Sequence, residues 1–268
     1  MSVRLSLETF GPSDGLPLVL LHAFPLDSRM WQDVISELDD IRVVTLDAPG
    51  FGDSPSPREL ADELGCPVAP SLKTYAEAIA LTLTDAGVDR AVVAGLSMGG
   101  YAALEVAERH PGLLAGIGLL DTKAGTDGPE ARANRIRVAD QAVGAMGSRA
   151  VAPMVDAVLS PRTHRERPDV VATVRDWLAT APPNGVSWAQ RAMAARPDRL
   201  AVLERLEVPG LVLRGTDDAS SSMDDAEAME HALHDGELVV VPRAGHLSAV
   251  EEPREVATAL RSLYMRCR

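Results

Sequence analysis

One serine in the chain stands in a sequence that could make it a nucleophile. Ser97 is the middle residue of Gly95-Leu-Ser-Met-Gly99, which follows a β-branched run and precedes a run rich in alanine and leucine. This is the pattern of a nucleophile elbow, a sharp turn from a strand into a helix. The flanking glycines suit it, because the two backbones pass close to the serine there. The pattern predicts a nucleophilic Ser97, with the N–H of Met98 aimed at a developing oxyanion. A glycine-rich turn with a bystander serine is the alternative.

A serine hydroxyl is a poor nucleophile at neutral pH, so a base must accompany it. Among the six histidines, His22 and His246 each follow an expected strand. In parallel α/β sheets, functional side chains gather beyond the carboxyl ends of the strands. His246 stands in a glycine-containing loop that could reach Ser97, and we predict that it is the base. His22 is expected to brace its own loop by hydrogen bonds.

A carboxylate must then orient the imidazole and stabilise its charged form. Asp217 and Asp218 both leave the strand that precedes His246, and Asp121 ends an earlier strand. The chain order serine, aspartate, histidine is the one expected for this arrangement. We predict that Asp218 is the acid, because its loop and that of His246 follow successive strands. Asp121 and Asp217 stay open as alternatives.

An oxyanion needs a second N–H donor besides that of Met98. The donor should come from the loop after the apolar run Leu18-Val-Leu-Leu21, which reads His22-Ala-Phe-Pro25. Phe24 is the residue of that loop that we expect to donate.

The expected elements explain how these residues could meet. Up to residue 120, apolar strands alternate with helices, and the alternation resumes after residue 206. This order predicts an α/β fold with a mostly parallel central sheet and helices on both faces. Residues 2–9 alternate like an edge strand, whereas the proline-rich residues 55–70 are expected to be irregular. Strands are expected near 18–21, 41–46, 92–94, 114–120, 211–214 and 237–241.

The alternation breaks between residues 122 and 206, where only helical stretches are expected. We interpret residues 122–206 as a helical cap inserted into a core made of residues 1–121 and 207–268. A cap of this kind would roof the pocket and set substrate size. Trp188 and Met193 are the cap residues that we expect to bind substrate.

The composition excludes several classes of protein. Of the 268 residues, 46% are hydrophobic and 24% charged, as in globular proteins, and the net charge of −13 argues against nucleic acid and anionic membranes as partners. The two cysteines show no metal-binding or disulfide spacing. The N-terminus lacks the apolar core of a signal peptide, and no run is long enough to span a membrane. We therefore expect a cytoplasmic protein with a small-molecule substrate and with no metal or organic cofactor.

Taken together, the motifs resemble those of the α/β-hydrolase superfamily, and the resemblance runs from about residue 3 to residue 264. It rests on Gly-Leu-Ser97-Met-Gly-Gly, His22-Ala-Phe-Pro, Asp47-Ala-Pro-Gly-Phe-Gly-Asp-Ser, Gly215-Thr-Asp-Asp218 and Ala-Gly-His246. Within the superfamily, the chain looks most like small cofactor-free esterases, enol-lactonases and haloperoxidase-like enzymes. The resemblance implies Ser97 as nucleophile, His246 as base and Asp218 as acid, with Phe24 and Met98 as oxyanion donors. One departure is Ala23, where the family usually has glycine.

These observations predict a serine hydrolase that cleaves an ester or lactone of a small, largely apolar acid through an acyl-enzyme. The same three side chains could serve a cofactor-free perhydrolase or haloperoxidase-like enzyme, or a carbon–carbon hydrolase. A small-ligand receptor that keeps the fold without turnover is the alternative from another class.

Overall fold

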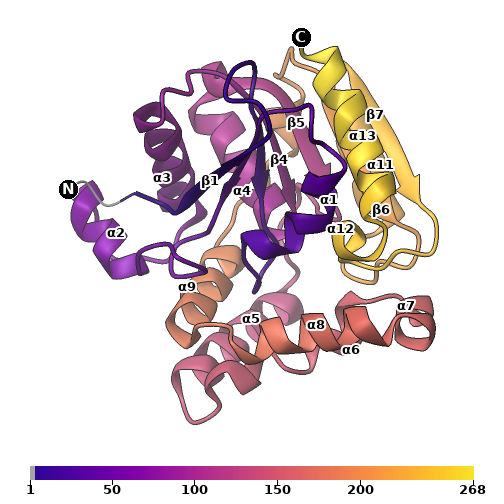
Figure 1. The fold of residues 1–268 in the computed structure, drawn as a ribbon. Coiled ribbons are helices and arrows are strands. Elements are labelled where there is room, and N and C mark those ends of the chain that lie inside the picture. The colour runs from indigo at the N-terminus through magenta and orange to yellow at the C-terminus, as the bar shows by residue number, and fades with distance from the viewer. Residues whose placement is uncertain (1–3) are drawn as a thin grey trace.

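A seven-stranded sheet forms the centre of the computed structural model, which describes residues 4–268 (Figure 1). The strand order is β1-β3-β2-β4-β5-β6-β7. β1 pairs antiparallel with β3, and every other pairing is parallel. The strands are β1 (Leu7–Phe10), β2 (Leu18–Leu21), β3 (Val43–Leu46), β4 (Ala91–Leu96), β5 (Leu114–Leu120), β6 (Gly210–Gly215) and β7 (Gly236–Val241).

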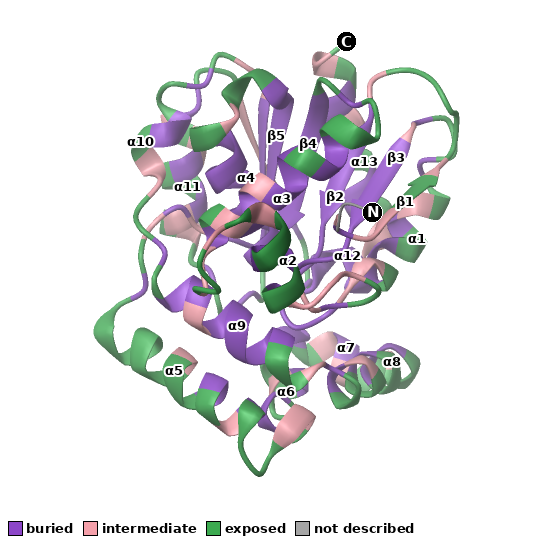
Figure 2. Cartoon of the chain, turned by 90° about the vertical axis from the view of Figure 1, so that its left-hand side faces the viewer, coloured by how far each residue is buried: buried purple, intermediate pink, exposed green. Residues whose placement is uncertain are grey.

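The burial of each strand matches its sequence pattern. The continuous apolar runs of β2, β4 and β5 are buried at every position, as expected for strands with helices on both faces (Figure 2). The edge strands β1 and β7 are only partly buried. The strand expected over residues 2–9 is shorter in the structure, and Val3 of that expectation lies outside the described residues.

Helices pack on both faces of the sheet. α1 (Gln32–Ser36), α12 (Ser248–Glu251) and α13 (Pro253–Arg266) pack together on one face. α3 (Leu72–Asp85), α4 (Met98–Arg109) and α11 (Met223–Ala232) cover the other. Two short 3₁₀ helices lie in the connections, η1 (Ser28–Trp31) between β2 and α1 and η2 (Pro111–Leu113) between α4 and β5. The mostly parallel α/β fold predicted from the alternation is therefore confirmed.

One expectation for the core was wrong. Residues 55–70 are not irregular throughout, because α2 (Pro57–Leu64) lies within them. Its first turn is stabilised by a capping box, in which Ser56 accepts from the N–H of Glu59 and Glu59 accepts from the N–H of Ser56. Proline at the first helical position suits a helix start, since its missing N–H would have no partner there. The prolines here therefore begin a helix.

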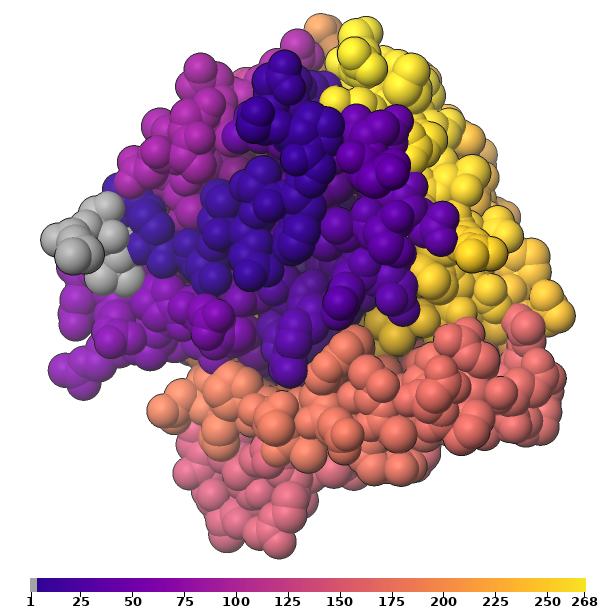
Figure 3. Space-filling model, viewed as in Figure 1, coloured from indigo at the N-terminus to yellow at the C-terminus, as the bar shows by residue number. Residues whose placement is uncertain are grey.

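Between β5 and β6, the described chain contains helices and no strand. This segment lies against one end of the sheet and contacts both the N-terminal and C-terminal parts of the core (Figure 3). α5 and α9 pack against each other, and Gly185 at the start of α9 meets Gly50 of the core, where an added Cβ would approach a carbonyl oxygen to 2.5 Å. The helices are α5 (Pro129–Val143), η3 (Gly147–Ala150), α6 (Met154–Val158), α7 (Pro161–Glu166), α8 (Pro168–Ala179), α9 (Pro183–Ala194) and α10 (Leu200–Leu203).

Within residues 4–268, no helix combines the length and the apolar character that crossing a lipid bilayer requires.

Candidate active site

Ser97 sits at the turn between β4 and α4 in a strained backbone conformation. Its φ of 55° and ψ of −110° lie outside the regions that residues with a side chain normally adopt. Two hydrogen bonds hold the turn: the N–H of Ser97 donates to the carbonyl of Leu120 at 2.9 Å, and Thr122 Oγ1 donates to the carbonyl of Ser97 at 2.8 Å. β5 and the residues just after it therefore fix the serine in place.

The glycines on either side of the serine are required by close packing. A Cβ at Gly95 would lie 2.1 Å from the backbone of Gly99, and a Cβ at Gly99 would lie 2.1 Å from the carbonyl oxygen of Leu21. Both distances are far below a van der Waals contact. This is the close approach of strand and helix that the spacing of the motif predicted.

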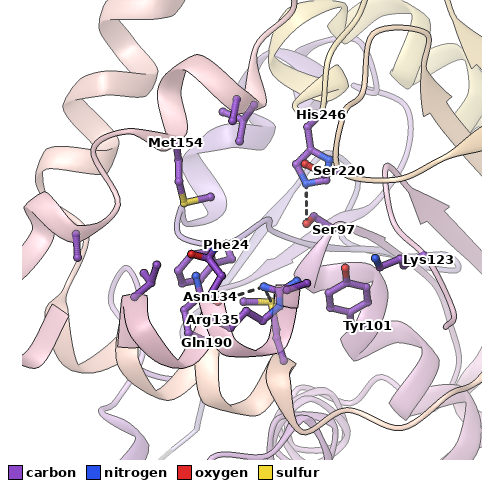
Figure 4. Close-up of a pocket in the computed structure, with 16 residues that line it drawn as sticks. Phe24, Ser97, Tyr101, Lys123, Asn134, Arg135, Met154, Gln190, Ser220 and His246 are labelled. Carbon is purple, nitrogen blue, oxygen red and sulfur yellow. Dashed lines mark hydrogen bonds between the residues drawn. The ribbon is translucent and has the colours of Figure 1, made fainter. Parts of the chain in front are cut away.

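Ser97, His246 and Asp218 form a continuous chain of hydrogen bonds. His246 Nε2 lies 2.8 Å from Ser97 Oγ (Figure 4). On the other side of the ring, His246 Nδ1 lies 2.9 Å from Asp218 Oδ1. Because the carboxylate can only accept, Nδ1 carries the proton, and in the neutral ring Nε2 is free to accept from the serine hydroxyl. The three side chains come from the ends of β4, β6 and β7, as the sequence predicted.

The surroundings of Asp218 keep it ionised. Burial alone would raise the pKa of Asp218. The hydrogen bond and charge of His246, with further hydrogen bonds from the Ser221 hydroxyl and the N–H of Ser220, outweigh burial and lower this pKa. Burial alone would lower the pKa of His246, yet the hydrogen bond and charge of Asp218 raise it overall. The pair therefore favours an imidazolium next to a carboxylate.

The other two aspartates considered from the sequence take different places. Asp217 is exposed and accepts from the hydroxyl of its neighbour Thr216. Asp121 is fully buried and accepts from the N–H of Gly215 at 2.8 Å and from the hydroxyl of Ser248. Burial and the nearby charge of Asp218 raise the pKa of Asp121 to about 7. Neither aspartate hydrogen bonds to the imidazole.

His22 braces the loop that follows β2, as expected. Its Nδ1 donates to the carbonyl of Ala23 at 2.9 Å, so its Nε2 accepts from the N–H of Ala48 at 2.8 Å. Burial lowers the pKa of His22, which keeps the ring neutral as this pattern requires. Phe24 follows in the same loop and lines the cavity beside Ser97.

The two N–H groups expected to bind an oxyanion, those of Phe24 and Met98, make no hydrogen bond within residues 4–268. Met98 opens α4, where the helix dipole adds positive potential.

A cavity of about 250 Å³ opens next to Ser97 and His246. It is lined by residues of the core and of the helical segment between β5 and β6, which we call the insertion. Met193 lines the cavity, whereas Trp188 is buried and lies outside the lining. Several polar lining residues were not predicted from the sequence, because the cavity forms only where the helices between β5 and β6 pack against the loops and helices of the core. They are Tyr101, Lys123, Asn134, Arg135, Gln190 and Ser220.

The chain belongs to the alpha/beta hydrolase family, whose model matches residues 18–259. It is similar to a thermophilic esterase from Thermogutta terrifontis, with 37% identity, a TM-score of 0.90, and coverage of 98% of this chain and 93% of that one. It is also similar to 3-oxoadipate enol-lactonase 1 of Acinetobacter baylyi, with 26% identity over 94% of this chain and 89% of that one.

Another relative is longer. The chain is 26% identical to a biotin biosynthesis bifunctional protein of Cellvibrio japonicus over 92% of its own length, and it spans only 47% of that relative. Family membership and the esterase and enol-lactonase relatives together support hydrolase activity.

Proposed function

We propose that the protein is a serine hydrolase that cleaves an ester or lactone of a small substrate through an acyl-enzyme. The observation that carries the proposal is the hydrogen-bonded chain from Ser97 through His246 to Asp218, which opens on a cavity of about 250 Å³. A cavity of this size fits a substrate smaller than most drug-sized ligands.

In the proposed mechanism, His246 Nε2 takes the proton of Ser97 as its Oγ attacks the substrate carbonyl. The N–H groups of Phe24 and Met98 stabilise the resulting oxyanion. His246 then gives the proton to the departing alkoxide, which leaves the acyl group on Ser97. Water attacks the acyl-enzyme by the same route and restores the serine. Asp218 holds the imidazole in the required tautomer and stabilises its charged form.

The relatives support the choice of bond. The Thermogutta relative is described as an esterase and the Acinetobacter relative as an enol-lactonase, so ester and lactone cleavage are the reactions that the similarity favours. For acyl-chain preference, we propose Met193, which lines the cavity, as a contact that limits substrate size. Trp188 would act on that preference only through the packing of α9.

The experiment that tests the proposal replaces the nucleophile. On a panel of p-nitrophenyl esters and lactones, Ser97→Ala should lower kcat by about 10⁴-fold or more, with an unchanged circular dichroism spectrum. The exposed Ser36→Ala serves as the matched control and should retain wild-type activity. A rapid burst of one p-nitrophenol per active site would report the acyl-enzyme. If Ser97→Ala kept a tenth of the wild-type kcat, the proposed mechanism would be wrong.

A further inference from the structure

The cavity beside Ser97 carries positive charge in an acidic protein. Of the sixteen described residues that line it, Lys123 and Arg135 are cationic and none is acidic (Figure 4). The chain as a whole has a net charge of −13. The cavity therefore has the opposite charge to the molecule as a whole. A neutral, apolar substrate would form no ion pair with these two cations.

Among residues 4–268, Lys123 and Arg135 form ion pairs with one carboxylate, that of Asp127, which they share with a third cation. Asp127, with a side chain 2% exposed, lies within 4.0 Å of Lys123, Arg135 and Arg196. Arg196 alone already binds both carboxylate oxygens of Asp127, at 2.7 and 2.9 Å, in a bidentate pair. Although burial opposes it, Arg196 and Arg135 hold the pKa of Asp127 well below its usual range, so a single ionised carboxylate is shared by Lys123, Arg135 and Arg196.

Arg135 and Lys123 also keep hydrogen-bond donors that the protein does not use. Arg135 donates Nε to Asp127 at 2.6 Å and Nη1 to Gln190 and Met193, while its Nη2 has no acceptor among the described residues. In the part of the chain that the structure describes, the Lys123 ammonium forms one ion pair, with Asp127 at 3.4 Å, and no hydrogen bond. The Tyr101 hydroxyl lines the cavity between them without an intramolecular hydrogen bond in residues 4–268.

Arg135 faces the same cavity as the reacting groups. Arg135, Ser97 and His246 all line this cavity of about 250 Å³. A substrate group held by Arg135 would therefore lie in the same small cavity as the bond that Ser97 attacks.

We propose that the substrate carries a carboxylate, and that Arg135 and Lys123 bind it during ester or lactone cleavage. The proposal rests on the function proposed above and deepens it by naming the substrate class. A guanidinium edge and an ammonium offer donors to the two oxygens of a carboxylate, and such charge-assisted hydrogen bonds are stronger than neutral ones. Arg135 and Lys123 are specificity residues in this proposal, and they take no part in the chemical step.

A matched pair of esters tests the proposal. Mono-p-nitrophenyl adipate carries a free carboxylate, and its neutral counterpart has an amide at the same position. After subtraction of the uncatalysed rate, the wild-type kcat/KM should be about 10- to 100-fold higher for the anionic ester, the range that a hydrogen bond to a charged group gives. Added salt should reduce this preference, because both cations are partly exposed to solvent.

Substitutions then assign the preference to residues. Arg135→Gln and Lys123→Gln should each lower the ratio of anionic to neutral kcat/KM by about tenfold, since each removes one charged donor. Arg175→Gln is the matched control, because Arg175 is an exposed arginine of the same insertion that does not line the cavity. It should leave the ratio unchanged. If Arg135→Gln does not fold, because it removes a contact with Asp127, Lys123→Gln still gives the result.

A binding measurement separates this proposal from the proposed function. Ser97→Ala protein, which cannot turn over, is titrated with adipate and with its neutral diamide by calorimetry. Tighter binding of adipate that Lys123→Gln weakens supports the proposal even if no ester is cleaved. Ester cleavage without an anionic preference, or with a preference that survives both substitutions, would leave the hydrolase function intact and overturn the carboxylate site.

Discussion

The carboxylate of Asp121 accepts a hydrogen bond of 2.8 Å from the N–H of Gly215, the last residue of β6 before the turn that leads to Asp218. Its other oxygen accepts from the hydroxyl of Ser248, two residues after His246. Asp121 therefore ties together the two loops that hold Asp218 and His246. Asp218 itself is the carboxylate that reaches the imidazole, at 2.9 Å from Nδ1. We infer that Asp218 is the acid and that Asp121 is a positioning residue.

Asparagine substitutions should separate these roles. Asp218→Asn keeps the shape but removes the charge and permits the wrong imidazole tautomer, so kcat should fall by about 10⁴-fold. Asp121→Asn can still accept from Gly215, and its loss should stay below about tenfold. The exposed Asp217→Asn is the control and should match the wild type. All three are measured on one p-nitrophenyl ester. A larger loss at Asp121 than at Asp218 would move the acid to the strand β5.

The pH dependence should report the charge around His246. The base must be neutral, and the carboxylates of Asp218 and Asp121 raise the pKa of His246 above its ordinary value of 6.5. The kcat/KM should therefore be highest on the alkaline side and fall as the pH drops through that raised pKa. Asp121→Asn removes the charge that Asp121 carries above its own raised pKa of about 7, so its acidic limb should move to lower pH, by less than the loss of the Asp218 charge would cause.

The same profile for Asp217→Asn provides the control. This substitution also removes one negative charge, but from an exposed side chain that does not contact the imidazole. Its acidic limb should coincide with that of the wild type. Equal displacement in both variants would mean that net charge, and not the position of Asp121, sets the pKa of His246.

The elbow, the sheet and the Ser97–His246–Asp218 chain were predictable, because the strands and the loops that follow them can be recognised from local sequence. Buried parallel strands are continuous apolar runs, and the side chains at their carboxyl ends must meet at one edge of the sheet. The capping box of Ser56 and Glu59 was also present in the sequence, but the neighbouring prolines suggested an irregular segment. Proline breaks a helix in its interior, but Pro57 stands at the first position of α2, where its missing N–H is not needed.

The cavity lining could not be predicted in the same way. Asp127 and Arg196 are 69 residues apart, and they meet only because the insertion folds back on itself. Which side of α5 or α9 faces Ser97 depends on how the helices of the insertion pack. For this reason, Met193 lines the cavity while Trp188, on the same helix, does not.

Gly99, two residues after the nucleophile, should be intolerant of any side chain. In Gly99→Ala the new Cβ would lie 2.1 Å from the carbonyl oxygen of Leu21, so the strand or the helix must move. Overpacking of this kind typically costs about 1–3 kcal/mol, and here the atom that must move is backbone. We expect a lower Tm and a large loss of kcat. Thermal unfolding and ester hydrolysis measure both.

Gly112→Ala is the matched control for this prediction. Gly112 has no heavy atom within 4 Å of the position of an added Cβ, apart from its chain neighbours. Its substitution should leave both Tm and kcat near the wild-type values. A Gly99→Ala protein as stable and active as Gly112→Ala would mean that the elbow can relax, contrary to our interpretation of the motif.

Glu251 links the helical insertion to the loop that carries His246. It is buried in α12, where Oε1 accepts from the N–H of Gly245 at 2.7 Å. Its Oε2 accepts from the N–H of Ser160 at 2.8 Å and from Thr163 Oγ1 at 2.6 Å. One carboxylate thus satisfies donors from the residue before His246 and from the start of α7. Removing the charge of Glu251 should therefore change the position of the His246 imidazole and weaken the packing of α7 against the core.

Glu251→Gln tests this link, because the side-chain NH2 of glutamine can only donate and would replace a carboxylate oxygen that accepts from the N–H of Gly245 or of Ser160. Leaving a buried donor unsatisfied costs about 1–3 kcal/mol. For a chain of this size, that corresponds to a Tm lower by roughly 2–4 °C per kcal/mol. We also expect a lower kcat, because Gly245 positions His246. Glu255→Gln, an exposed substitution with the same chemistry in α13, should change neither quantity. If Glu251→Gln matched Glu255→Gln in both Tm and kcat, the insertion and the His246 loop would be independent of each other.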